Sequence, residues 1–215
     1  MSATTLLALA ALSLLPLLLM TATSFVKLEV VLSLMRNALG APEVPSSAII
    51  TALAAILSAY VMAPVAAEIA PGWAQASARI DWDDPLAGDS RSALLEALAA
   101  SKPPLARFLA RNAGQAERGL FERLARRAGA LAPGAEDLTV LLPAFLITEL
   151  KEAFQVGLLV LLPFVVIDLV MTSTLLSLGM SLLPPSAVAL PFKLLLFVLV
   201  DGWYVLSEAL ISSYR

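Results

Sequence analysis

The sequence predicts an all-α membrane protein of long helical hairpins, with four apolar segments and a small helical polar insertion. Three observations lead to this fold class. Of the 215 residues, 60% are hydrophobic and 14% charged, and the mean hydropathy is +0.88, whereas a soluble domain is about half apolar and about a quarter charged. The charges gather in the middle of the chain, and prolines and glycines divide the remainder into helix-length pieces. Apolar surface on this scale needs lipid or protein partners to cover it.

Charge divides the chain into N-terminal membrane helices (residues 1–67), a polar insertion (68–139) and a C-terminal helical hairpin (140–215). The insertion holds 19 of the 31 charged side chains, whereas residues 44–67 carry none and residues 153–192 carry only Asp168. Within the insertion we expect irregular chain at 71–73 and 81–85, followed by short amphipathic helices at about 90–102, 104–112 and 115–127. Its charges are best explained as a solvated face; the alternative is a patch for an acidic partner formed by Arg123, Arg126 and Arg127.

The N-terminal part begins with an apolar segment, residues 6–20, which is long enough to start a membrane span and whose helical pattern continues to Leu39. A cleaved signal peptide is the alternative, although residues 1–5 lack its positive charge. Gly40 and the prolines that follow it end this helix. The next helix starts from a serine cap at Ser46 or Ser47 and is expected to reach Met62, before Pro64.

The C-terminal part contains two apolar arms that predict a helical hairpin. The first arm runs through Phe154 to Leu178, and the second from Val188 to Leu206. Between them, the segment 179–185 contains one glycine and two adjacent prolines, which interrupt a helix. We therefore expect two antiparallel helices joined by a short turn.

Ionisable side chains in and beside these apolar arms are the strongest functional signal, because a charge at the centre of a bilayer costs roughly 2.5–3.5 kcal/mol. Asp168 and Lys193 are equally far from the middle of the predicted turn, so they should face each other across the hairpin. Asp201, eight residues after Lys193 on the same predicted helix, is too far away to pair with it and needs a partner on another segment or subunit. The full set of candidates for a buried ion network that supports assembly is Glu149, Lys151, Glu152, Asp168, Lys193 and Asp201.

The composition excludes much of enzyme chemistry. The chain has no Cys and no His, so it offers neither a thiolate nor an imidazole, nor a zinc site of the usual kind. It also lacks the glycine-rich phosphate loops and the G-x-S-x-G nucleophile motif. We predict no enzymatic activity, no catalytic residues, no cofactor and no metal. The net charge of −3 argues against a nucleic-acid partner.

Three stretches together resemble one protein family. They are "TSFVKLEVVLSLMRNALGAPEVP" (23–45), "ITELKEAFQVGLLVLLPFVVIDLV" (147–170) and "LGMSLLPPSAVALPFKLLLFVLVDGW" (178–203). Their order and content are similar to those of the FliP/SctR/HrcR proteins, core components of the type III secretion and flagellar export apparatus. The segment "FVKL" at 25–28 resembles the injectisome branch more than the flagellar branch, which favours "FTRI" there.

The resemblance implies a ring of five copies in the bacterial inner membrane, joined by two small export-gate membrane proteins and by larger membrane proteins of the apparatus. Such a ring forms the entry pore for unfolded secreted substrates, and the polar insertion faces the periplasm. It also implies that a methionine-rich loop seals the pore. The corresponding residues here are Gly179, Met180, Ser181, Leu182 and Leu183, of which only Met180 keeps a methionine.

Two other functions remain open from the residues alone. The chain could be a subunit of an ion-coupled membrane transporter that uses Asp168, Lys193 and Asp201 as a relay. It could also be a membrane scaffold without a pore of its own. A structural role for the buried ions is favoured over a relay, because a relay usually needs several carboxylates or a His along one face.

Overall fold

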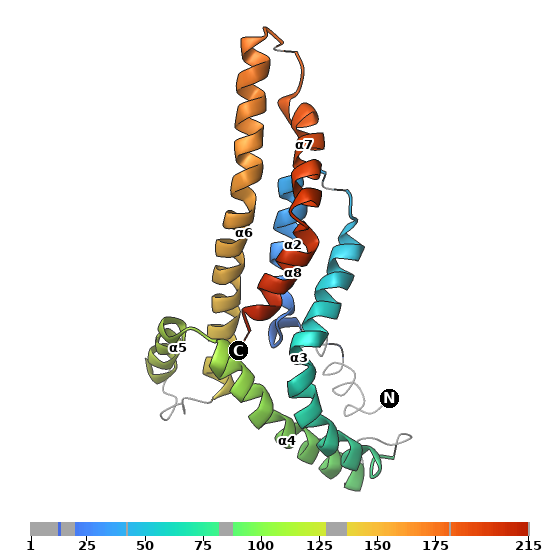
Figure 1. Cartoon of the computed structure of the whole chain (residues 1–215). Coiled ribbons are helices and arrows are strands. Elements are labelled where there is room, and N and C mark those ends of the chain that lie inside the picture. The colour runs from blue at the N-terminus through green and yellow to red at the C-terminus, as the bar shows by residue number, and fades with distance from the viewer. Residues whose placement is uncertain are drawn as a thin grey trace. The chain divides into compact units, whose positions relative to one another are not determined.

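The computed structural model describes residues 13, 20–41, 43–81, 88–127, 137–180 and 182–214, and the regular structure of these residues is entirely helical (Figure 1). This confirms the predicted all-α class. The apolar segment 6–20 lies almost wholly outside the described residues, as do Ser181 and most of the segment 81–85. The helices are α2 (Phe25–Leu39), α3 (Ser47–Ser77), α4 (Gly88–Asn112), α5 (Gln115–Arg127), α6 (Leu138–Ser177), α7 (Pro185–Leu199) and α8 (Gly202–Ser212).

The chain forms two compact units, and their boundaries lie inside α3 and α6. Residues 25–58 and 149–215 form one, which we call the hairpin unit; residues 1–24 and 59–148 form the other, the insertion unit. Among the described residues, α3 and α6 are long and apolar enough to cross a membrane. The bent pair α7 and α8 would add a third span if it crosses as one.

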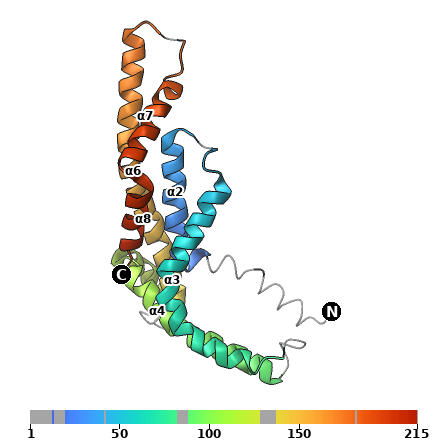
Figure 2. The same cartoon turned by 45° about the vertical axis from the view of Figure 1, so that its right-hand side comes forward.

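In the hairpin unit, α2 and the first turns of α3 form a short hairpin (Figure 2). Residues 22–24 form a turn, and α2 starts at Phe25. The prediction that one helix continues to Leu39 is therefore wrong at this turn. The end of α2 is as predicted: Gly40 follows Leu39 with φ +81°, a conformation that glycine adopts at no steric cost. Spacings of three and four bring one apolar face of α2 into the core.

Two predicted helix ends at prolines are wrong. Helix α3 continues through Pro64 and Pro71 to Ser77, and α4 continues through Pro103 and Pro104 to Asn112. A proline removes one backbone hydrogen bond and kinks a helix, but a long helix held by packing on both sides of it tolerates that loss. The irregular chain predicted at 71–73 is therefore helical, and the two short helices predicted at 90–102 and 104–112 are one.

The turn between α6 and α7 lies where the prolines and glycine predict it, and Figure 1 shows the two arms that it joins. Gly179 has φ +72° and donates its N–H to Leu176 O at 3.1 Å, while Met180 donates to Leu175 O at 2.9 Å. These two bonds are the Schellman pattern that ends a helix at a glycine. Pro184 then precedes Pro185 at the first position of α7, where the missing N–H has no helical partner to lose.

The second arm is not one helix, as the sequence predicted, but two. Helix α7 ends at Leu199 and α8 begins at Gly202, with an angle of 60° between them. Asp201 sits in the bend with φ +51° and ψ +52°, the left-handed conformation that Asp tolerates better than most residues. The ring of Phe197 covers Gly202, and Trp203 stacks edge-on against that ring at 5.3 Å. Lys193 and Asp201 therefore do not lie on one helix.

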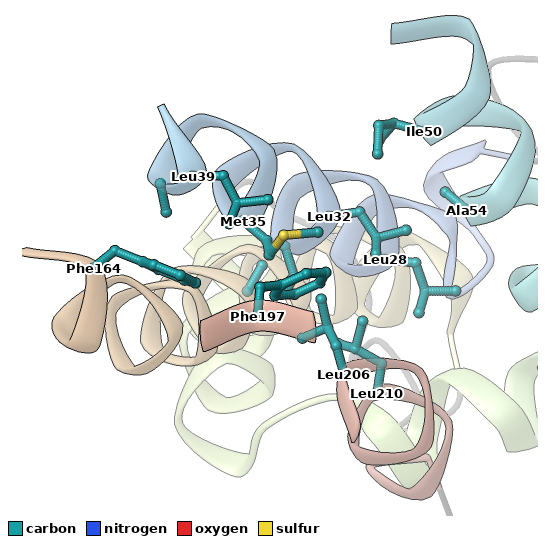
Figure 3. Packing of buried hydrophobic residues seen from close by; sticks show 13 residues of the cluster. Leu28, Leu32, Met35, Leu39, Ile50, Ala54, Phe164, Phe197, Leu206 and Leu210 are labelled. Atoms are coloured by element: carbon teal, nitrogen blue, oxygen red, sulfur yellow. The ribbon is translucent and has the colours of Figure 1, made fainter. Parts of the chain in front are cut away.

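The core of the hairpin unit lies between α2, α6, α7, α8 and the start of α3. Figure 3 shows Met35 and Leu32 of α2 beside Phe197 of α7, with Phe164 of α6 and Leu206 of α8 at the same cluster. Gly157 brings α6 so close to α2 that a Cβ there would lie 2.4 Å from Leu34 Cδ1. The remaining buried members are Leu28, Val31, Ala38, Leu39, Ile50, Ala54, Ala153 and Leu210.

The insertion unit has a thinner core and more surface ion pairs. Phe108 of α4 packs on Phe145 of α6 with ring centroids 5.6 Å apart. Arg79 lies 2.6 Å from Glu96 and 3.0 Å from Asp89, and its hydrogen bond holds the pKa of the exposed Asp89 carboxyl below its usual value. These exposed pairs contribute little to stability, so the unit depends on its small helix contacts.

The tight contact at Gly202 predicts that one added methyl group lowers the stability of the fold. A Cβ at this position would lie 2.1 Å from the Phe197 ring, so we expect Gly202→Ala to lower the free energy of unfolding by about 1–3 kcal/mol, as overpacking does. Gly119→Ala on α5 is the matched control, because its Cβ would meet only Arg123 Nη1 at 3.5 Å. Thermal unfolding in detergent, followed by circular dichroism, measures both. Equal unfolding temperatures for the two variants would contradict the close contact.

Candidate functional site

Lys193 of α7 joins three helices of the hairpin unit. Its Nζ donates to Asp168 Oδ2 of α6 at 2.7 Å and to the carbonyl oxygen of Ala38, in the last turn of α2, at 3.2 Å. Lys193 is 5% exposed, and Gly40 packs beside it, where a Cβ would lie 3.8 Å from Nζ. The structure thus contains the pair that the hairpin geometry predicts. The other carboxylate oxygen, Asp168 Oδ1, is buried without a hydrogen-bond partner among the described residues.

A second buried cluster surrounds Lys27 in the first turn of α2. Lys27 Nζ lies 3.3 Å from Glu149 Oε1 and 2.9 Å from Glu152 Oε2, both on α6. The Tyr214 hydroxyl donates to the other oxygen of Glu149, and the Tyr214 ring lies 3.9 Å from Lys27 Nζ in a cation–π contact. The side chains of Lys27 and Glu149 are 2% and 1% exposed. The cluster therefore holds the start of α2, the base of the hairpin and the chain's C-terminal residues together.

The six predicted network residues do not form one group. Glu149 and Glu152 belong to the cluster around Lys27, Asp168 and Lys193 form the second site, and Lys151 is exposed. Asp201 is also exposed and makes no side-chain cap on α8. The roles of all six in assembly stay predictions.

Two residues of these sites were not among the sequence candidates. Lys27 had a detectable signal, since it interrupts an apolar helix face that continues at Leu28 and Val31. Tyr214 had none, because a tyrosine next to the end of a chain has no pattern around it. Lys27 gives Glu149 and Glu152 a shared cation, and Tyr214 gives Glu149 a hydrogen bond.

The tip of the hairpin exposes the apolar side chains that the resemblance assigns to the pore seal. Leu182 is 96% exposed, and Met180 and Leu183 are 43% and 42% exposed. Gly179 turns the chain at this point with its positive φ. Ser181, the remaining residue of this predicted loop, lies outside the described residues.

The outer surface of both arms is also apolar. Large hydrophobic side chains are exposed along the whole length of α6 within the hairpin unit and along α7 and α8. A single copy in water would not tolerate this much exposed apolar surface, so it marks contact with lipid or protein. Examples are Phe154, Leu158, Leu162, Val166, Leu169, Leu176, Phe192, Leu195, Val198, Leu199 and Tyr204.

Comparison of the sequence with known proteins identifies its family. The FliP family model matches residues 8–210. The chain belongs to the FliP family. It is 42% identical over 209 residues to the hypersensitivity response secretion protein HrcR of Ralstonia nicotianae, covering 95% of this chain and 94% of that protein.

Two further relatives widen the comparison. The flagellar biosynthetic protein FliP of Pectobacterium carotovorum is 40% identical over 217 residues, covering 100% of this chain and 79% of that protein. The probable translocation protein y4yL of Sinorhizobium fredii is 42% identical over 209 residues, covering 95% and 90%. This FliP-family chain is thus a membrane component of a type III export apparatus, and the family is a structural part of that apparatus.

The Lys27 cluster predicts that a double change costs less stability than the single change. Lys27→Met leaves the buried Glu149 carboxylate without its cation, which costs about 3–5 kcal/mol of stability. Adding Glu149→Gln should recover more than half of that loss, because no buried charge then remains unpaired. Chemical denaturation in detergent measures the free energies of unfolding. Arg91→Met, at an exposed position of α4, is the control and should change little. Additive losses in the double variant would contradict the pairing.

Proposed function

We propose that this protein is a pore-forming subunit of a type III secretion export gate in the bacterial inner membrane. Copies of the chain form a ring, with five as the expected number, and unfolded substrates pass through its centre. The single observation that carries the proposal is the tip of the α6–α7 hairpin. There, Met180 and Leu182 are held out by a defined helix end in a FliP-family chain.

The chemistry of the tip suits a seal around a passing chain. Apolar side chains brought together from several copies would exclude water and ions when the pore is empty. Methionine adapts its shape to irregular partners, and Leu182, with 96% of its surface exposed, has no packing in its own subunit to give up. The turn therefore combines a fixed backbone at Gly179 with side chains that are free to close on one another.

The two buried lysine sites support assembly. They pair the two buried lysines of the hairpin unit with acids of α6. The outer surface that remains is apolar, and neighbouring copies and the two small export-gate proteins would cover it. The larger membrane proteins of the apparatus would then dock on this core. Assignment to the injectisome branch rests on Phe25–Leu28, and the polar insertion would face the periplasm.

If the tip seals the pore, shortening its apolar side chains should let ions leak through a gate that still assembles. Met180→Ala combined with Leu182→Ala should raise the passage of small ions across membranes that contain the assembled gate, since the narrowest ring loses its bulk. Conductance in reconstituted bilayers measures this. Leu95→Ala with Leu98→Ala on α4 removes two exposed apolar side chains outside the hairpin and should not leak. A tight double variant at the tip would reject the seal.

Substitution of Lys193, together with crosslinking from the hairpin tip, distinguishes this proposal from its two alternatives. Lys193→Ala removes hydrogen bonds to a charged group and to a carbonyl, worth about 1.5–3 kcal/mol for the charged one, so we expect loss of the detergent-stable oligomer on native gels. Lys193→Met with Asp168→Asn should retain it better. An intact oligomer that loses only proton-dependent transport would favour an ion-coupled transporter. A scaffold would be favoured if crosslinks from residues 179–185 never reached a secreted substrate.

A further inference from the structure

Helix α5 is anchored to its unit at its first turn and exposed beyond it. The N–H of Gly114, just before the helix, donates to Thr148 Oγ1 of α6 at 2.8 Å. Arg118 donates to Ala110 O of α4 at 3.4 Å. No residue of α5 is buried, and the helix nevertheless separates apolar from charged residues clearly along its faces. An amphipathic helix of this kind has a face that the described chain does not cover.

The open surface of α5 consists of two adjacent rows. Leu120 and Leu124, four residues apart, form an apolar row and are 40% and 45% exposed. Arg123 and Arg127, also four apart, form an exposed basic row beside it. Long arginine side chains beside an apolar row can rest their stems on a membrane surface and place their charges at its phosphates. The face thus fits an interface between apolar and anionic layers.

The charge on α5 has the sign that such an interface needs. Four arginines oppose two glutamates in its 13 residues, a local charge of +2 in a chain of −3. Glu122 pairs with Arg126 at 3.4 Å. Arg123 and Arg127 form no salt bridge with the residues that the structure describes. Two arginine charges therefore remain for an anionic partner.

The residue that anchors α5 belongs to α6, a long apolar helix. Its anchor, Thr148, lies only five residues before Ala153, where the nearly uncharged run of α6 begins. Helix α6 is itself long and apolar enough to cross a membrane. A basic amphipathic helix fastened next to such a segment is well placed to meet lipid headgroups.

We propose that α5 docks along the surface of an anionic lipid bilayer, with Leu120 and Leu124 at the acyl boundary and Arg123 and Arg127 against lipid phosphates. Basic amphipathic helices bind in this way, with affinity from both apolar burial and charge. Such a contact would fix the depth of the insertion unit at the membrane. It does not depend on the pore proposed above.

The absence of native cysteine makes a direct test possible. The full chain with Leu124→Cys is labelled with an environment-sensitive fluorophore and reconstituted with its complex into phosphatidylcholine vesicles, with or without 30% phosphatidylglycerol. Spin-labelled lipids then quench any probe that reaches the acyl boundary. We expect at least twofold stronger quenching in the anionic vesicles. A label at Ala99→Cys, exposed on α4, should show no dependence on phosphatidylglycerol.

Charge removal supplies the second half of the test. Arg123→Gln with Arg127→Gln should lower the ratio of docked to undocked α5 about 30-fold, because each arginine near an anionic surface contributes roughly 1 kcal/mol to binding. Arg91→Gln with Arg111→Gln on α4 is the charge-matched control and should change nothing. Quenching that is weak in both vesicles, or that ignores the arginines, would overturn the proposal. So would shielding of the probe from lipid by a protein subunit, since that outcome assigns the face to a protein partner.

Discussion

The ion pair between Lys27 and Glu149 is the contact on which the hairpin unit depends most. Both side chains are almost fully buried, and taking two charges out of water is costly unless each gains further hydrogen bonds. Glu152 and Tyr214 supply those contacts. The pair is therefore stable only when α2, the base of α6 and the C-terminal end of the chain are all in place, which couples the folding of three distant segments.

The second lysine site extends this constraint to the other end of α2. Lys27 holds the first turn of the helix and Lys193 bonds the carbonyl of Ala38 in its last. Because both ends of α2 are bound to acids on α6, one directly and one through α7, a slip of the arms by a single turn would break both sites at once. The tight Gly157 contact lies between them. Two polar sites thus give a mainly apolar bundle a unique register, which apolar packing alone specifies less well.

Sequence reasoning succeeded where local chemistry decides and failed where packing decides. The helix ends at Gly40 and Gly179 follow from backbone freedom, and both are where the residues predict them. The prolines predicted helix ends that the structure does not have, since α3 continues through Pro64. The bend at Asp201 was missed because its cause, the Phe197 ring over Gly202, is a contact rather than a pattern. For the candidate site, hairpin symmetry was enough to pair Asp168 with Lys193, whereas the partners of Glu149 come from segments 65 and more residues away.

The hairpin unit reverses the pattern of a soluble domain, because it buries charged side chains and exposes apolar ones. Its best-buried side chains include Lys27, Glu149 and Lys193, while large apolar side chains cover the outside of α6, α7 and α8. Lipid and protein can both cover an apolar surface, but lipid hydrocarbon offers no hydrogen-bond donor to a buried polar atom without a partner among the described residues, such as Asp168 Oδ1. A carboxylate oxygen buried without a donor costs about 1–3 kcal/mol. The buried oxygen therefore places a polar requirement on the hairpin unit that lipid hydrocarbon cannot meet.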